Sequence, residues 1–306
     1  MLTAAVDTYL AARRAVGFKL RDHEGILRDF AAFASAKENT HVRSETVLEW
    51  VGRGTKSPLR NCVRLRTVVR FARYVHAEDD RHEVPPEDAC GRHRPHRRPP
   101  FLFSVAQVEA LVRAALTLGP PSCLQAHVYS TLFGLLAATG MRISEALNLR
   151  FEDVTPEGLV VCNTKFAKSR LLPLHATTRL RLESFVARRR KLAGSCPWVF
   201  VSKITGRKLH ANTARGVFRR LVYALGIARP QDKLRPRLHD LRFYFASQAL
   251  TMSPGDPDGI SRHMLALTTY LGHRDVRNGY WYLEATPALF AKISDRCEAY
   301  ASGGNS

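Results

Sequence analysis

The sequence has no paired cysteines, no long apolar run and few acidic residues. Its six cysteines are widely scattered and form no C-x-x-C pair, a usage typical of a reducing compartment where cysteine serves as a small apolar residue. No run of about 18 apolar residues occurs, so we expect no membrane span. The first residues lack the basic start and the apolar stretch of a secretory signal. Together these absences predict a cytoplasmic protein.

Phosphate-loop and metal-site motifs are missing as well. There is no G-x-x-x-x-G-K-[ST] loop and no cluster of carboxylates, so we expect neither ATP nor a catalytic metal, and the sequence indicates no other cofactor. Cys90, His93 and His96 are candidate metal ligands. Because the arginines around them disfavour a bound cation, we expect no metal site there.

Positive charge is abundant. The chain has 47 Lys and Arg residues against 27 Asp and Glu, a formal net charge of +20. An excess of this size indicates a polyanionic partner, usually nucleic acid, with a merely basic surface as the alternative. The hydrophobic content of 45% supports folded cores, and 306 residues are enough for two domains.

The first domain, residues 1–86, is predicted to be helical throughout. Its fourth helical segment runs from about Pro58 to His76 and has an apolar set of Val63, Leu65, Val68, Val69, Phe71 and Val75. Several arginines in this segment lie three or four positions apart, so they share a face and repel one another. A phosphate backbone beside that face would relieve the repulsion, whereas a solvated charged face is the alternative. The arginines expected to contact DNA are Arg60, Arg64, Arg66, Arg70 and Arg73.

Residues 87–101 are predicted to form a basic linker. They are rich in proline and arginine, so a regular helix is excluded and a strap lying along DNA is expected. Residues 102–306 form the second predicted domain. Inside it, a loop is expected at residues 253–259, where serine, proline and glycine gather.

The second domain is predicted to combine helices with a small sheet. Ser104 and Gln107 form a capping-box pattern, and Gly140 is placed to end a helix over about Leu124–Ala138. Two strands are expected at Gly158–Cys162 and Arg170–Leu174. Helices are expected near residues 176–191, 211–225, 239–251, 260–270 and 286–299. The fold class is therefore mainly α with a small β-sheet, in two domains.

Five residues of the second domain suggest a phosphate-transfer site. They are Arg142, His239, Arg242, His273 and Tyr282. Guanidiniums and imidazoles suit a phosphate whose charge grows in a transition state, and a phenol among cations suits covalent attack on it. Each residue alone has an ordinary alternative: an ion pair of Arg142 with Glu145 or Glu152, a surface H-x-x-R pair, or a core tyrosine. The hypothesis of a phosphate-transfer site rests on the occurrence of all five residues in this order along the chain.

Basic residues of the expected hairpin turn could add to this site. Lys165 and Lys168 lie between the two predicted strands, and Arg170 opens the second one. A lysine at a hairpin tip can reach a DNA groove and deliver a proton, and Lys168 competes with Lys165 for this role. For both lysines a solvent-exposed turn charge is the alternative. We expect Lys168 and Arg170 to contact DNA.

With these motifs, the chain resembles the tyrosine recombinase (phage integrase) family. The resemblance covers most of the chain, and its specific motifs lie in residues 102–298: A-T-G-M-R, H-D-L-R, L-G-H and the final tyrosine. Residues 1–86 are similar to the family's core-binding domain, a SAM-like helical bundle, by pattern and position. The Tyr280–Pro287 run resembles members encoded by transposons and plasmids. The spacing between Arg242 and His273 is longer than usual in the family, and the extra residues fall in the loop at residues 253–259.

The resemblance implies DNA cleavage and rejoining through a 3′-phosphotyrosyl intermediate on Tyr282. It implies charge stabilisation by Arg142, Arg242 and His273, protonation of the leaving oxygen by Lys165, and proton transfer assisted by His239. It also implies a homotetramer on two sites of double-stranded DNA, in which residues 286–299 pack on a neighbouring protomer, with or without companion recombinases. The alternatives are a type IB topoisomerase-like nicking and closing enzyme and a DNA-binding accessory protein without chemistry.

Overall fold

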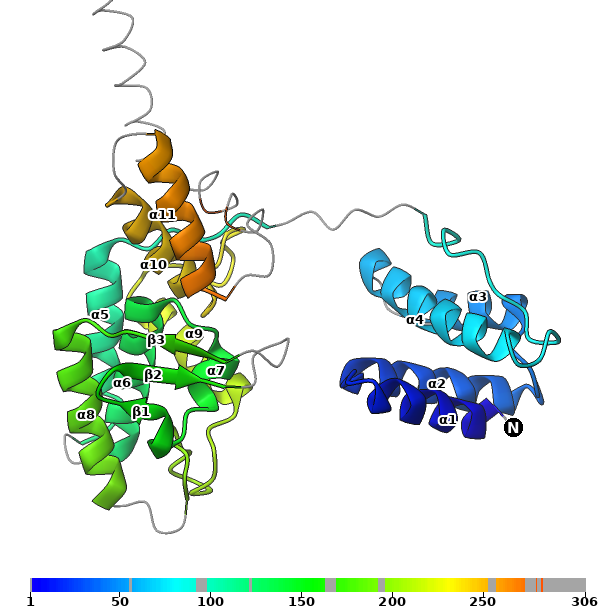
Figure 1. Ribbon diagram of the computed structural model, residues 1–306, viewed down its shortest axis with the longest axis horizontal. Coiled ribbons are helices and arrows are strands. Elements are labelled where there is room, and N and C mark those ends of the chain that lie inside the picture. Colours follow the sequence, from blue (N-terminus) through cyan, green and yellow to red (C-terminus); the bar gives the residue numbers. More distant parts are fainter. Residues whose placement is uncertain are drawn as a thin grey trace, which may run out of the picture. The chain divides into compact units, whose positions relative to one another are not determined.

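Two structural units follow one another along the chain, Met1–Arg97 and Arg98–Ser306 (Figure 1). The computed structural model describes residues 2–54, 57–91, 98–120, 123–162, 169–191, 196–252, 257–272, 279 and 282. The division falls inside the predicted linker, residues 87–101. In the part of the chain so described, no helix combines the length and the apolar character that crossing a membrane requires.

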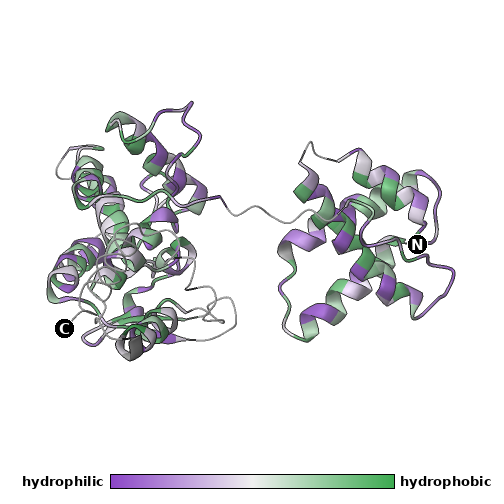
Figure 2. Cartoon of the chain, turned by 90° about the horizontal axis from the view of Figure 1, so that it is seen from above, coloured by the Kyte–Doolittle hydropathy of each residue, from purple (hydrophilic) through white to green (hydrophobic). Residues whose placement is uncertain are grey.

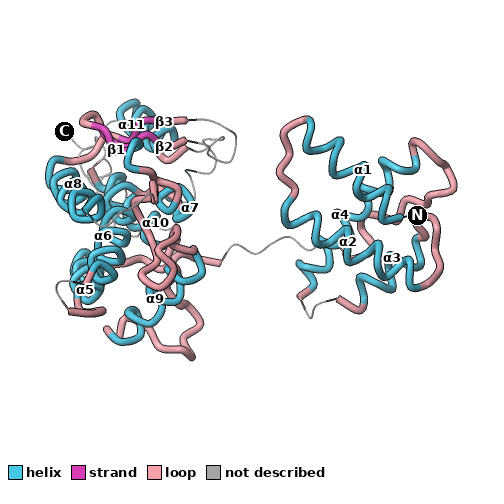
Figure 3. The backbone as a smooth tube through the Cα atoms, turned by 90° about the horizontal axis from the view of Figure 1, so that it is seen from below, coloured by secondary structure: helices cyan, strands magenta, loops and turns pink. Residues whose placement is uncertain are grey.

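The described part of unit 1 is a helical bundle (Figure 3). Its helices are α1 (Leu2–Ala15), α2 (Arg21–Ala36), α3 (Ser44–Gly52) and α4 (Pro58–His76). Helix α4 packs on the other helices with the predicted apolar set buried, except that Val63 is 46% exposed. Val63 differs from the rest of the set because its position on the helix faces away from the core formed by Leu65, Val68 and Phe71.

The segment after α4 continues to pack against unit 1. Arg73 forms an ion pair with Glu87 at 2.9 Å, and Cys90 packs against the core of the unit. Sγ of Cys62, inside α4, lies 3.7 Å from the carbonyl oxygen of Cys90. Residues 87–91, predicted as the start of the linker, are thus attached to unit 1.

Unit 2 is built around one apolar helix. Helix α6 (Leu124–Thr139) is buried along most of its length and contacts α5 (Val105–Leu116), α8 (Ala176–Lys191) and α10 (Asp240–Thr251). A helix that is apolar all round is stable only where neighbours cover every face. The remaining described helices are α7 (Ile143–Leu147), the short 3₁₀ helix η1 (Phe151–Asp153), α9 (Ala211–Ala224) and α11 (Pro257–Tyr270). Figure 2 colours the chain by hydropathy and shows hydrophobic and hydrophilic residues along the helices of both units.

A small antiparallel sheet accompanies these helices in the order β1-β2-β3. Its strands are β1 (Val154–Thr155), β2 (Gly158–Val161) and β3 (Arg170–Leu172). The register pairs Leu159 with Leu172 and Val161 with Arg170. The two predicted strands are confirmed, although both end earlier than expected, and β1 was not predicted. The mainly helical fold class with a small sheet is therefore confirmed.

Two predicted helix caps of unit 2 are confirmed. The Ser104 side chain accepts from the Gln107 backbone, and the Gln107 side chain accepts from the Ser104 backbone. Gly140 ends α6 with a φ of 59°. A Cβ at Gly140 would lie 2.5 Å from Phe245, so both the backbone conformation and the space require glycine.

The last described helices, α10 and α11, pack together at one end of unit 2 (Figure 1). Their contact is a small apolar cluster that contains Phe243, Leu250, Met264 and Tyr282. Helix α11 begins at Pro257, so residues 257–259, predicted as loop, form its first turn; residues 253–256 lie outside the described part. The cluster brings Tyr282 beside α10, which carries Arg242.

Candidate active site

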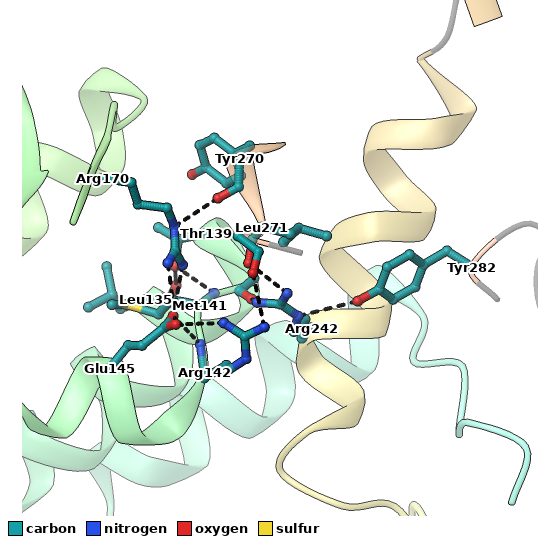
Figure 4. A network of polar contacts seen from close by, with 12 residues as sticks. Leu135, Thr139, Met141, Arg142, Glu145, Arg170, Arg242, Tyr270, Leu271 and Tyr282 are labelled. Atoms are coloured by element: carbon teal, nitrogen blue, oxygen red, sulfur yellow. Dashed lines mark hydrogen bonds and ion pairs between the residues drawn. The ribbon is translucent and has the colours of Figure 1, made fainter. Parts of the chain in front are cut away.

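Arg242 lies at the centre of the candidate site. It is 2% exposed, and among the described residues its guanidinium reaches three segments (Figure 4). Nη1 donates to the carbonyl of Gly140 at 2.7 Å, Nη2 donates to the carbonyl of Leu271 at 2.8 Å, and Nε donates to the hydroxyl of Tyr282 at 3.2 Å. Burial lowers the pKa of Arg242. Carbonyls at the ends of α6 and α11 thus hold this cation at the negative ends of two helix dipoles.

Arg142 enters the same site from the start of α7. Its Nη1 donates to Oε1 of Glu145 at 2.8 Å, and its Nη2 donates to the carbonyl of Gly272 at 3.3 Å. Arg142 and Arg242 are therefore bound to the consecutive carbonyls of Leu271 and Gly272, although they lie 100 positions apart in the sequence. The Arg142 side chain is 30% exposed, which leaves it accessible to a ligand at the surface.

The carboxylate of Glu145 holds Arg142 in place. Its carboxylate also accepts the backbone N–H of Arg142 at 2.9 Å and pairs with Arg170, whose Nη2 lies 2.8 Å from Oε2. Burial raises the pKa of Glu145, but the hydrogen bonds and charges of Arg170 and Arg142 outweigh it, and the pKa lies below its usual value. Glu145 thus remains a buried anion that holds two arginines. The ion pair with Glu145, the predicted alternative for Arg142, is present, and the site role of Arg142 stays a prediction.

Arg170 lies inside the site, contrary to its prediction as a DNA contact. Its side chain is 15% exposed, and Nε donates to the carbonyl of Tyr270 at 3.0 Å. With the remaining guanidinium atoms bound to Glu145, its donors face the protein, and its geometry suits a positioning role. Local sequence pattern placed it at a strand start but could not pair it with a carboxylate 25 residues away.

His239 lies at the N-terminus of α10, one helical turn before Arg242. The pKa of His239 is lowered to about 4, first because neighbouring atoms desolvate the ring and then because Arg242, Arg237 and Arg142 add positive charge. The residue is exposed at the surface. The imidazole of the free protein is therefore neutral at neutral pH.

Tyr282 is 4% exposed and packs edge-on against Phe243, with ring centroids 4.8 Å apart. Its hydroxyl meets Arg242 (Figure 4). The structure thus brings together Arg142, His239, Arg242 and Tyr282. Lys165, Lys168 and His273 lie outside the described residues.

The predicted DNA contacts of α4 are in two different environments. Arg60, Arg66, Arg70 and Arg73 are exposed, although Arg73 pairs with Glu87. Arg64 differs, because its guanidinium lies 3.8 Å from the Trp50 ring centroid and bonds to the Trp50 carbonyl. Arg64 therefore supports the bundle, whereas DNA contact by the other four stays a prediction.

One group among the described residues has metal-ligand geometry, and it lies in unit 1: His41, Asp79 and His82. Nδ1 of His82 accepts the backbone N–H of Val42 at 3.0 Å, and Arg81 binds both oxygens of Asp79. These internal partners already use the ligand atoms of two members, so the group serves the fold of the segment after α4.

Comparison with known proteins finds a family match over the part of the chain that contains the candidate site. The model of the phage integrase family matches residues 103–288. A protein of Sinorhizobium fredii described as an integrase/recombinase, y4rB, is 37% identical over 306 residues, with 96% of each chain covered. The tyrosine recombinase XerD of Brucella suis is 28% identical over 300 residues, covering 92% of this chain and 90% of that protein.

Solved structures share the fold. The integrase of the transposon Tn1549, in complex with transposon right-end DNA, has a TM-score of 0.65 at 17% identity, covering 96% of this chain and 98% of that one. The recombinase XerH bound to a palindromic difH substrate has a TM-score of 0.63 at 16% identity, covering 89% of this chain and 78% of that one. At these identities the likeness shows the fold alone.

Proposed function

The chain belongs to the phage integrase family, the tyrosine recombinases, and on that premise we propose how its own residues break and rejoin DNA. It is a site-specific DNA recombinase of the tyrosine type. We assign the nucleophile to Tyr282 and the charge stabilisation to Arg142 and Arg242. One observation carries the assignment: Arg242 bonds to the Tyr282 hydroxyl, while Arg242 and Arg142 are held by consecutive carbonyls.

The cleavage step follows from these positions. The oxygen of Tyr282 attacks the scissile phosphorus, the bond to the 5′-oxygen breaks, and a 3′-phosphotyrosyl link forms. Arg142 and Arg242 stabilise the charge that grows on the non-bridging oxygens. Neutral His239 takes part in moving the tyrosine proton, and Lys165 delivers a proton to the leaving 5′-oxygen. His273 adds to the oxyanion contacts.

Rejoining is the reverse of this step with a new strand end. A free 5′-hydroxyl attacks the phosphotyrosyl phosphorus, and the tyrosine oxygen leaves with its proton restored. The covalent link conserves the energy of the phosphodiester, so strand transfer needs no ATP. The number of bonds broken equals the number formed.

The partner we propose is double-stranded DNA in the cytoplasm. The net charge of +20 and the exposed arginines of α4, Arg60, Arg66, Arg70 and Arg73, support a phosphate-contacting surface. The relatives crystallised with DNA include a λ integrase tetramer on a Holliday junction. By analogy we propose a homotetramer on two DNA sites; residues 286–299, which we expect to pack on a neighbouring protomer, lie outside the described residues. Integration, excision or transposition of a mobile element is the biological use that we expect.

Trapping on a nicked suicide substrate tests the proposal. Cleavage beside the nick releases a short fragment, so the 5′-hydroxyl is lost and the covalent complex accumulates on a denaturing gel. The wild-type chain is expected to form it, and DNA binding without any covalent complex would leave the accessory-protein alternative. Relaxation of supercoiled DNA without recombinant product would favour the topoisomerase-like alternative.

A further inference from the structure

The catalytic histidine is presented by a tight turn that a buried carboxylate closes. The backbone N–H of Asp240 donates to the carbonyl of Arg237 at 2.8 Å. In return, the Asp240 carboxylate accepts the backbone N–H of Arg237 at 2.7 Å and its Nη2 at 3.1 Å. His239 lies inside this turn, directly before α10. Its backbone is therefore fixed by the residue that follows it.

Asp240 is fully buried, at 0% exposure, so its carboxylate has no access to DNA. Burial raises the pKa of Asp240, and the hydrogen bonds from Arg237 and from the backbone of Phe101 oppose that rise. The carboxylate thus holds the backbone of the residues directly before α10.

The residues that lead into unit 2, Arg98–Phe101, form what we term the lead-in segment. This segment is hydrogen-bonded to the loop that precedes His239. Nη2 of Arg98 donates to the carbonyl of Arg235 at 2.8 Å and to that of Lys233 at 3.3 Å. Phe101 also packs against Phe103, with ring centroids 4.9 Å apart, at the edge of the unit 2 core.

We infer that Asp240 is a positioning residue for strand cleavage: it closes the turn that presents His239, and Arg98 attaches the lead-in segment to the loop just before that turn. It touches no substrate and acts by fixing the first turn of α10, from which both His239 and Arg242 project. The inference rests on the proposed function. Because Arg98 binds the carbonyls of Lys233 and Arg235, displacement of the lead-in segment moves the loop that runs into this turn and its catalytic groups.

The same chain offers a matched control for the turn that Asp240 closes. Arg229 and Asp232 form an equivalent turn in the same loop: the Arg229 backbone N–H donates to Asp232 at 2.6 Å, and the Asp232 backbone N–H donates to the Arg229 carbonyl at 3.1 Å. Asp232 is exposed and carries no catalytic neighbour in its turn. A general effect of removing a turn-closing carboxylate would appear at Asp232 as well.

The test compares single-turnover cleavage of the suicide substrate at saturating DNA for Asp240→Asn, Asp232→Asn and Arg98→Ala in the full chain. A small misplacement of catalytic groups costs up to roughly 100-fold in rate, so we expect Asp240→Asn to cleave about 10- to 100-fold more slowly with unchanged DNA affinity. Arg98→Ala should slow cleavage by a few-fold, and Asp232→Asn should match the wild type.

Wild-type cleavage rates in both Asp240→Asn and Arg98→Ala would overturn the inference. So would a slow Asp240→Asn variant whose DNA affinity falls by the same factor, if Arg98→Ala cleaves normally, because a merely structural role predicts that result. Thermal unfolding of each variant identifies a loss of fold, and Arg98→Ala then decides, since it leaves the buried carboxylate intact. Absence of any covalent complex with the wild-type chain would instead overturn the proposed function.

Discussion

Glu145 binds Arg170 through both carboxylate oxygens, at 2.8 and 3.3 Å, and this ion pair supports Arg142. The same carboxylate bonds to the side chain and the backbone of Arg142. Arg170 in turn contacts the carbonyl of Tyr270, at the end of α11. The network therefore connects α7, β3 and the segment whose next two carbonyls hold Arg242 and Arg142.

Replacing Glu145 with glutamine should destabilise the fold and slow cleavage. Removing one partner of a buried ion pair leaves the other charge uncompensated, and we expect the free energy of unfolding to fall by about 3 kcal/mol. Glu152→Gln is the control, because Glu152 is 72% exposed and pairs only at the surface with Arg150, where a change below about 1 kcal/mol is expected. Urea unfolding measures both, and equal stability of the two variants would contradict the role of Glu145.

The lowered pKa of Glu145 also predicts an acid-sensitive fold. A carboxylate whose pKa is depressed by folding adds stability above its unfolded pKa, and that stability is lost as pH falls through the folded value. The wild-type midpoint of urea unfolding should therefore fall more steeply below about pH 4.5 than that of Glu145→Gln. Parallel curves for the two proteins would argue against a charged Glu145.

His239 of the free protein should titrate near pH 4. Desolvation and three nearby arginines lower its pKa from 6.5, so its protonation in the folded state is unfavourable and its neutral form persists through pH 6. Because the unfolded chain protonates first, the contribution to stability falls as pH drops from about 6.5 toward 4. An NMR titration with His239→Gln for assignment measures the midpoint. A midpoint at or above 6.5 would contradict the lowering of the His239 pKa by desolvation and by the three arginines.

Gly140→Ala should disturb the carbonyl that holds Arg242. A Cβ there would lie 2.5 Å from Phe245 and 2.9 Å from Leu271, and the φ of 59° is strained for alanine. We expect a loss of more than about 1 kcal/mol in stability together with slower cleavage. Gly134→Ala in the same helix is the control, since its nearest neighbour atom lies 3.9 Å away. Thermal unfolding at or above the wild-type midpoint for Gly140→Ala would refute the packing argument.

The exposed arginines of α4 should contribute to DNA affinity in a salt-dependent way. The double variant Arg66→Ala, Arg70→Ala should bind DNA more weakly and reduce the slope of log affinity against log salt by about 2, roughly 0.9 for each lost phosphate contact. Arg64→Ala should instead lower the stability of unit 1, because its guanidinium stacks on Trp50. An unchanged salt slope in the double variant would exclude this face from the interface.

Local patterns in the sequence predicted the parts of the fold that depend on near neighbours. The Ser104 cap, the Gly140 stop and the strands on either side of residues 163–168 follow from spacings of a few residues. The predicted convergence of Arg142, Arg242 and Tyr282 relied on family resemblance, because no periodicity indicates contacts across 40 to 100 positions.

The network beneath the site could not be predicted for the same reason. Arg170 was expected at the DNA surface because the sequence indicated only that it begins a strand after a basic turn. Its ion pair with Glu145 depends on the tertiary fold. An acidic residue three positions after an arginine accepts the arginine's backbone N–H at Glu145 and at Asp240. The same pattern occurs away from the site at Asp153 and Asp232, so it predicts a local turn and not the network.

The central claim is that Tyr282 forms the covalent bond with DNA, and peptide mapping tests it most directly. The covalent complex trapped on the suicide substrate is digested with protease and nuclease, and the nucleotide-bearing peptide is identified by mass spectrometry. We predict a 3′-phosphoryl nucleotide on Tyr282, loss of the complex in Tyr282→Phe, and its retention in Tyr280→Phe. A nucleotide on any other residue, or undiminished complex from Tyr282→Phe, would contradict the account.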